Sequence, residues 1–232
     1  MNKLGTRIIG VGLLAIAAVT FSVSTSQAFS LRVPQITFGS PLLQAILNSR
    51  DGGIHVLTDQ LDAQAFTTNF TGTTDFYIAI QTSAGNEIGV YDGAAVGAPT
   101  LYQIFPPAAV QGWYAACHFD ASGGLFVALY DQTNTFQGST SYVGVTRTNF
   151  GFYISGGCGT FYSQDVRNPG NHAQVLTYLG TGTNFGDWFE CFESCPYSPT
   201  ASTFTSDILV LQSVAPTPTK AHTWGALKSS YR

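Results

Sequence analysis

The chain has 232 residues, of which 9% are charged, and its formal net charge at pH 7 is −4. Nucleic acid is therefore a poor partner, because phosphate backbones bind basic surfaces. A helical bundle is also disfavoured, since exposed helix faces carry many Lys, Glu and Arg residues.

The first 28 residues have the features of a secretory signal peptide. Lys3 and Arg7 give a basic start, residues 8–21 form an apolar run, and Ser26-Gln27-Ala28 has the small-x-small form of a cleavage site. A membrane anchor is the alternative, but the run is shorter than the roughly 20 residues of a span. We expect cleavage after Ala28 and a secreted, extracellular or cell-surface protein without a transmembrane span. Removing 28 of the 232 residues leaves 204, which suits one domain.

One short helix is predicted near the start of the mature chain. Ser40 would cap it, Pro41 would take its first position, and apolar residues at helical spacing follow over 42–47. The Asn, Asp and Gly residues of 48–53 would end it.

Short aromatic and β-branched runs then alternate with clusters of Gly, Asn, Asp and Thr, which is typical of an antiparallel sandwich or barrel. Residues 120–124 (Asp-Ala-Ser-Gly-Gly) form a predicted hairpin turn. We predict an all-β fold, a jelly-roll-like antiparallel β-sandwich over 29–214. The expected strands are 54–58, 76–82, 87–91, 101–105, 113–119, 125–130, 141–145, 150–155, 159–163, 173–179, 187–195 and 206–211.

The C-terminal end is predicted to lie outside the sandwich. Residues 215–219 (Ala-Pro-Thr-Pro-Thr) resemble a stiff polyproline linker that would not join a sheet. The following tail, 220–232, is cationic and amphipathic, and would act in recognition or attachment. An unstructured terminus or one packed on its own domain is the alternative. The candidate interaction residues are Trp224, Leu227, Lys228, Tyr231 and Arg232.

Four cysteines in an exported chain indicate two disulfides. We favour Cys191–Cys195, because these two residues are close across an expected turn, and Cys117–Cys158 then follows. A metal site of four thiolates is disfavoured, since no Cys-x-x-Cys occurs.

The acidic residues give no clear catalytic constellation. Glu190 and Glu193 could serve a carbohydrate-active hydrolase, which needs two carboxylates flanking a sugar bond, but a spacing of three places them on opposite faces of a strand. His118 and Asp120 share a strand face, yet no third ligand for a transition metal can be named. Glu193 and Asp207 lie at the two ends of the loop 194–205, where they could form a weak calcium site. No other cofactor is expected.

Several stretches carry a family resemblance. They are the helix at 42–47, then 57–60, 88–92, 103–105, 150–153, 159–163, 168–170, 172–178, 192–193 and 207–210. In this order the chain resembles a bacterial secreted or cell-surface domain of unknown function, often found in exported proteins with C-terminal sorting tails of the PEP-CTERM type.

The resemblance implies a β-sandwich, an extracellular or cell-surface location, a calcium site in Phe-Glu-Asp and Asp-x-Asp-Phe-Asn-Asp segments, and no enzymatic activity. This acidic motif is degenerate here. Ser194 stands where an Asp would follow Glu193, and residues 203–206 (Thr-Phe-Thr-Ser) replace the acidic run before Asp207. A Cys191–Cys195 disulfide would then hold the loop in place of an ion.

These observations predict a non-catalytic β-sandwich module with a binding or structural role. Its partner would be a cell-envelope or extracellular matrix component, or a second copy of the chain. The alternative is a secreted hydrolase using Glu190 and Glu193.

Overall fold

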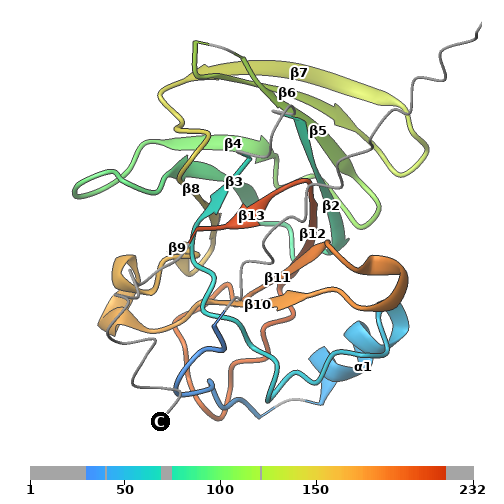
Figure 1. Ribbon diagram of the computed structural model, residues 1–232, viewed down its shortest axis with the longest axis vertical. Coiled ribbons are helices and arrows are strands. Elements are labelled where there is room, and N and C mark those ends of the chain that lie inside the picture. Colours follow the sequence, from blue (N-terminus) through green and yellow to red (C-terminus); the bar gives the residue numbers. More distant parts are fainter. Residues whose placement is uncertain (1–29, 40, 69–74, 121, 218–232) are drawn as a thin grey trace, which may run out of the picture.

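Two antiparallel sheets face each other in the computed structural model, which describes residues 30–39, 41–68, 75–120 and 122–217 (Figure 1). The predicted all-β sandwich is confirmed. The seven-stranded sheet has the order β10 (Val175–Leu179), β11 (Trp188–Phe192), β12 (Asp207–Gln212), β2 (Asp75–Thr82), β5 (Tyr114–Phe119), β6 (Gly124–Tyr130) and β7 (Phe136–Val143). The second has the order β13 (Ala215–Pro216), β1 (Phe66–Thr67), β8 (Phe150–Gly156), β3 (Glu87–Asp92) and β4 (Leu101–Phe105), with β9 (Gly159–Tyr162) paired to β8.

Large aromatic rings fill the space between the sheets. Phe76 and Phe119 come from the seven-stranded sheet and Phe150 from the other, and their ring centroids lie 5.4 to 5.7 Å apart. Each side chain is buried because it takes an inward position of its strand. Such ring pairs add about 0.5–1.5 kcal/mol each to the gain from burial.

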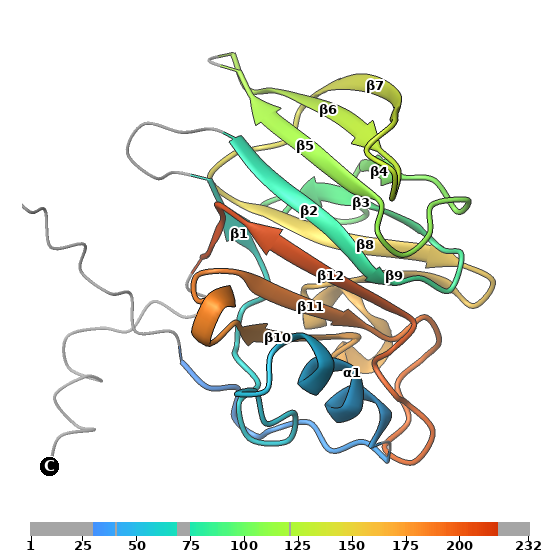
Figure 2. The same cartoon turned by 90° about the vertical axis from the view of Figure 1, so that its right-hand side faces the viewer.

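A second core lies on the outer face of β10, β11 and β12. Helix α1 (Leu42–Arg50) packs there, and Leu43 and Leu47 contact the group that includes Phe189 and Ile208. Figure 2 shows α1 in front of this end of the seven-stranded sheet. The helix was predicted, but it runs further than residue 47, and the placement of Ser40 lies outside the described residues. No helix in the described part of the chain is long and apolar enough to cross a membrane.

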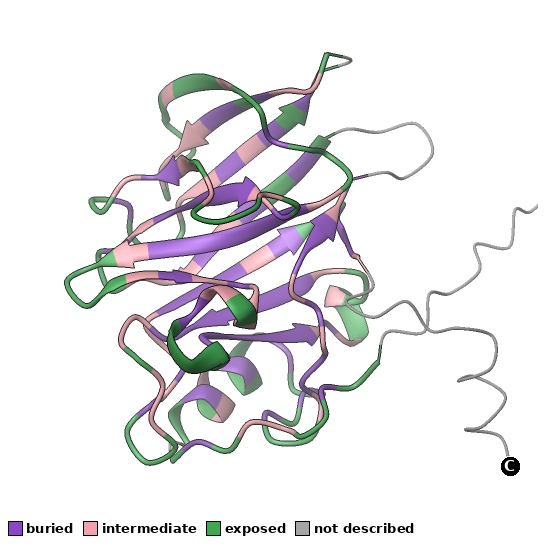
Figure 3. Cartoon of the chain, turned by 90° about the vertical axis from the view of Figure 1, so that its left-hand side faces the viewer, coloured by how far each residue is buried: buried purple, intermediate pink, exposed green. Residues whose placement is uncertain are grey.

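The outer face of the other sheet is covered by loops, so that β8 is buried along most of its length (Figure 3). Among these loops, the short 3-10 helix η1 (Asp165–Arg167) makes contacts through Arg167. The Arg167 guanidinium donates hydrogen bonds to the carbonyl oxygens of Gly93, Ala95 and Gly97. It also lies 5.2 Å from the ring centroid of Tyr91, which burial keeps protonated by raising its pKa to about 12.

Three predicted elements are corrected by the structure. Residues 54–58 form no strand: their backbone turns, with Thr58 and Asp59 donating to the carbonyl oxygen of His55, and Ile54 and Val56 fill the second core. The predicted strand 141–145 is the end of β7, which begins at Phe136. The strand predicted over 187–195 stops at Phe192.

The proposed linker also contributes to the sandwich. Ala215 and Pro216 form β13 and pair with β1, and the Thr217 N–H donates to the carbonyl oxygen of Ala65 at 2.8 Å. A proline is tolerated there because β13 is an edge strand. The sandwich therefore extends past residue 214. The predicted signal peptide 1–28 and the tail 220–232 lie outside the described residues.

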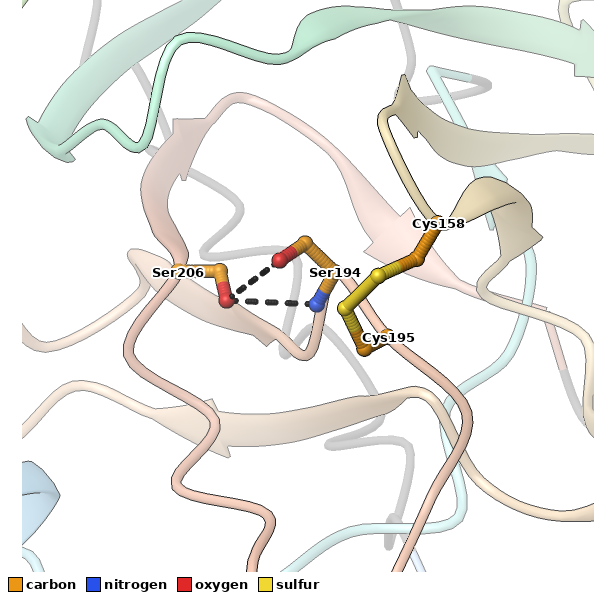
Figure 4. Close-up of a disulfide and its surroundings, with 4 residues drawn as sticks. All are labelled: Cys158, Ser194, Cys195 and Ser206. Carbon is orange, nitrogen blue, oxygen red and sulfur yellow. Dashed lines mark hydrogen bonds between the residues drawn. A yellow bond between two sulfur atoms is a disulfide. The ribbon is translucent and has the colours of Figure 1, made fainter.

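The predicted disulfides are wrong. Cys158, in the turn between β8 and β9, is bonded to Cys195, which follows β11, with 5.1 Å between the Cα atoms (Figure 4). Cys117 faces the space between the sheets and Cys191 faces the second core, so these thiols lie on opposite sides of one sheet. Burial raises the pKa of both thiols. The single disulfide links the two sheets, whereas sequence proximity had suggested a local loop.

Candidate functional site

An open hollow of about 750 Å³ lies on the outer face of the seven-stranded sheet. Figure 2 faces this surface: α1 lies at the β10 end of the sheet, whereas β2 and β5 have no helix in front of them. The hollow lies beside α1, over β11, β12, β2 and β5. Its size is within the range of ligand sites, about 300–1,000 Å³.

Side-chain alternation along β2 builds the floor. Phe76, Ile78 and Ile80 point into the core, which leaves Tyr77 and Gln81 on the outer face. Tyr77 is 46% exposed although it is a large aromatic residue. The remaining floor residues are Ala79 of β2, Tyr114 of β5, and Val210 and Gln212 of β12.

An aromatic row extends the floor across the sheet. Strand register aligns Ala79 with Tyr114, then with Tyr130 of β6 and Phe136 of β7. The rings of Tyr114 and Tyr130 are stacked, with 4.9 Å between centroids and an interplanar angle of 8°. Phe136 meets Tyr130 edge-on at 5.7 Å. The Tyr114 hydroxyl donates to Asn134, so this ring is held at both ends.

The wall beside α1 is held by a buried carboxylate. Asp51, which ends α1, accepts hydrogen bonds from the backbone N–H and hydroxyl of Thr181 and from the amide of Asn184. Burial opposes ionisation, but these donors hold the pKa of Asp51 below its ordinary value. Gly53 fits closely here, since a Cβ would come within 2.2 Å of Thr181 Oγ1. Asn184 also donates to the Arg50 carbonyl oxygen at 2.9 Å, so this wall is formed before any ligand binds.

The opposite wall is the loop between β4 and β5. Gly112 N donates to the Ile80 carbonyl oxygen at 2.9 Å, and Ile80 N donates to the Trp113 carbonyl oxygen at 2.9 Å. Gly112 has φ +89°, and a Cβ there would lie 2.8 Å from Gln132 Cβ, so this turn requires glycine. The loop places Gln111 at the rim of the hollow.

The hollow has little net charge. Arg50 and Asp187 are its two ionisable members besides the tyrosines, and their charges cancel. Asp187 accepts a hydrogen bond from Gln212 at 2.9 Å. Among the described residues, no hydrogen bond occupies the side-chain amides of Gln81 and Gln111. These two amides are therefore available to a ligand.

No protein-family model, curated protein or solved structure matches this chain.

Glu190 does not reach any open surface. Its side chain is fully buried on the inner side of β11, between Trp188 and Phe192, and burial raises its pKa to about 8. Thr177 Oγ1 lies 2.9 Å from the Ala63 carbonyl oxygen and 2.6 Å from Glu190 Oε1. One hydroxyl proton cannot serve two acceptors. We infer that Thr177 donates to the carbonyl and that Glu190, carrying a proton, donates to Thr177.

Glu193 and Asp207 are held by separate segments. Glu193 Oε2 accepts the backbone N–H groups of Thr203 at 2.7 Å and Phe204 at 3.2 Å. Asp207 accepts from the Asn86 amide at 2.6 Å and the Ala84 N–H at 3.2 Å, on the side of the β2–β3 turn. Both carboxylates thus order neighbouring backbone or amide groups.

Two serine hydroxyls meet where the loop 194–205 begins and ends. Ser206 Oγ lies 2.9 Å from Ser194 Oγ and accepts the Ser194 N–H at 3.2 Å (Figure 4). The adjacent Cys195 ties the loop to Cys158. The loop is therefore held by a disulfide, but Cys195 pairs with Cys158 and not with the predicted Cys191.

His118 and Asp120 are not brought together. His118 Nδ1 lies 2.5 Å from Asp75 Oδ1 on the outer face of the sheet, while Asp120 accepts hydrogen bonds from Ser122 and Gly124 within its hairpin. These hydrogen bonds lower the pKa of Asp120. In the described ranges, no group of three or more His, Cys, Asp or Glu side chains could hold a metal ion.

No linear motif in the sequence marks the hollow, because its lining residues are scattered along the chain. They come from β2, β5, β11 and β12, whose order in the sheet is not their order in the chain. One signal was present: four of the seven outward positions of β2 and β5 carry Tyr or Ala, where an ordinary solvated face would carry polar residues. The tail candidates Trp224, Leu227, Lys228, Tyr231 and Arg232 lie outside the described residues.

Proposed function

We propose that the protein is a non-catalytic, secreted or cell-surface β-sandwich module that binds its partner through the outer face of the seven-stranded sheet. The observation that carries this proposal is the hollow of about 750 Å³ with preformed walls and an aromatic floor. Exposed aromatic surface at a concave site marks a binding surface, because it gains most from leaving water. The partner is a cell-envelope or extracellular matrix component, with self-association as the alternative.

The acids support a non-catalytic role. Hydrolysis of a sugar bond needs two carboxylates flanking an open cleft, about 5–9.5 Å apart. Glu190 is enclosed in the core and Glu193 is occupied by backbone donors, so neither carboxylate faces the hollow. This arrangement gives the alternative, a hydrolase using these two residues, no support.

Calcium binding is a secondary part of the proposed function. Ca²⁺ prefers six to eight oxygen ligands, and Glu193 and Asp207 already accept two hydrogen bonds each from different segments. We therefore propose that any calcium binding at this pair is weak. Export is supported by the signal-like first 28 residues, and the Cys158–Cys195 disulfide is consistent with an oxidising compartment.

Co-sedimentation with an envelope and matrix preparation from the producing organism tests the proposal. The chain from residue 29 to 232 is compared with the double variant Tyr77→Ser, Gln81→Ala. Because both side chains are on the floor of the hollow, we expect at least a tenfold loss of bound protein. The matched control is Val96→Ser, Val166→Ser, which changes two exposed apolar residues outside the hollow. Equal sedimentation of all three proteins, or none for the unaltered chain, would contradict the proposal.

A further inference from the structure

The lining of the hollow indicates the chemistry of the ligand. From it we infer that the binding face takes a neutral polysaccharide, an inference that rests on the proposed function. A sugar ring has apolar C–H faces and a rim of hydroxyl groups. Its recognition therefore needs an aromatic surface together with side chains that both donate and accept hydrogen bonds.

The floor provides the aromatic surface. Tyr77 is 46% exposed, and its nearest neighbours along the same row of the sheet are Gln212 on one side and Ala116 on the other. Ala116 in turn lies opposite Ala128. Small residues beside an exposed ring leave a shallow surface on which a flat ring can lie. A deep pocket for a compact ligand would instead need bulky side chains all round.

Primary amides surround this floor. Gln81 and Gln111 line the hollow from β2 and from the opposite loop, and Asn184 lines it from the wall beside α1. Gln81 and Gln111 each offer two N–H donors and one carbonyl acceptor, which matches adjacent sugar hydroxyls, since a hydroxyl both donates and accepts. Asn184 offers its carbonyl acceptor, because its NH₂ group already donates to Arg50 and Asp51. Asn184 is already oriented by Asp51 and Arg50, so little ordering is left for binding.

Charge selects against acidic ligands. Arg50 and Asp187 cancel each other within the hollow, and Asp187 is further engaged by Gln212. An anionic polymer would need a basic stripe, and the whole chain has a net charge of −4. A neutral polymer meets no such penalty.

The aromatic row indicates a polymer as opposed to a single sugar. Val210, Ala79, Tyr114, Tyr130 and Phe136 lie in register on five adjacent strands. With strands about 4.8 Å apart, the row of five positions spans roughly 19 Å, and its three aromatic residues span roughly 10 Å. It leaves the hollow at Tyr114 and continues over β6 and β7. A chain of several sugar units fits this length, with one end in the hollow.

Native affinity electrophoresis tests the inference with the chain from residue 29 to 232. Separate gels contain hydroxyethyl cellulose, arabinoxylan, mixed-linkage β-glucan or dextran as neutral probes, and alginate or polygalacturonate as acidic ones. We expect retardation by at least one neutral probe and by neither acidic one. Tyr77→Ala should weaken the apparent Kd for that probe at least tenfold, and Gln81→Ala at least threefold. Val166→Ser should migrate like the unaltered chain, and circular dichroism confirms that each variant folds.

The outcomes of these experiments distinguish failure of the carbohydrate inference from failure of the proposed binding function. Binding to no neutral probe, equal binding to acidic probes, or full binding by Tyr77→Ala would overturn the carbohydrate inference. Protease digestion and periodate oxidation of the envelope preparation then identify the partner class. Binding that survives protease but is lost after periodate supports a polysaccharide, because periodate cleaves vicinal diols. Binding that is lost after protease and still depends on Tyr77 leaves the binding role intact and refutes the carbohydrate ligand.

Discussion

Replacing Glu190 by glutamine should make the protein more stable in mild alkali. Glu190 is fully buried, and burial raises the pKa of its carboxyl from 4.5 to about 8. The folded chain therefore holds this proton at pH values where the unfolded chain has lost it. The stability that Glu190 contributes is complete below the unfolded pKa and is lost as pH rises toward the folded pKa.

The size of the effect follows from that pH window. At about 1.4 kcal/mol per pH unit, the interval from 4.5 to about 8 corresponds to about 5 kcal/mol of unfolding free energy. Between pH 5 and pH 9 the expected loss is about 4 kcal/mol, because part of the change lies outside that range. Glutamine keeps a donor for Thr177 and cannot ionise, so the Glu190→Gln variant should lack this loss.

Urea unfolding followed by tryptophan fluorescence at pH 5, 7, 8 and 9 measures the effect. We expect the two proteins to differ little at pH 5 and the variant to be several kcal/mol more stable at pH 9, with an unchanged denaturant slope. Glu193→Gln is the control, because it changes a nearby acid that backbone N–H groups solvate, and it should retain the alkaline loss. Parallel pH profiles for wild type and Glu190→Gln would refute the assignment of a buried, protonated Glu190.

Three further predictions concern the walls and the loop. Asp51→Ala removes the acceptor for Thr181 and should lower the unfolding free energy by about 1–3 kcal/mol and weaken ligand binding. Unchanged thermal unfolding would show that other contacts hold this wall. Cys158→Ser opens a loop of sequence separation 37 and should lower stability by about 4 kcal/mol. Labelling of Cys158 or Cys195 by a thiol reagent in the native protein would reject the disulfide. Calorimetric titration with Ca²⁺ should give no constant tighter than about 0.1 mM, the weak end of protein calcium sites, and a micromolar constant abolished by Asp207→Asn would reverse our view of Glu193 and Asp207.

Local sequence signals predicted the strands where the chain itself marks their ends. β4 (Leu101–Phe105) has the predicted bounds, because Pro106 directly after it cannot continue the ladder. The strand predicted over residues 54–58 does not form, because tertiary packing overrides the local pattern. Ile54 and Val56 alternate as in a strand, but they are buried under α1, where the backbone turns.

The disulfide pairing and the assembly of the site depend on the order of the strands in the sheets. Local sequence patterns do not encode this order. Cys191 and Cys195 are neighbours in the chain, yet Cys191 is fixed inside β11 facing the second core, and Cys195 lies beyond the strand where it can reach Cys158. Similarly, β12 pairs with β2 across more than 120 residues, and only this pairing brings Gln212 beside Tyr77. A shift of one residue in that register would turn Tyr77 away from the hollow.

Binding of the partner by the outer face of the seven-stranded sheet can be tested directly. The most direct measurement is a ¹H–¹⁵N NMR titration of the chain from residue 29 to 232 with polysaccharide solubilised from the envelope preparation. Our account predicts chemical-shift changes at Tyr77, Gln81, Gln111 and Tyr114, with signals from the loop around Val96 unchanged. Changes gathered around that loop, or scattered without focus on β2 and β5, would contradict it.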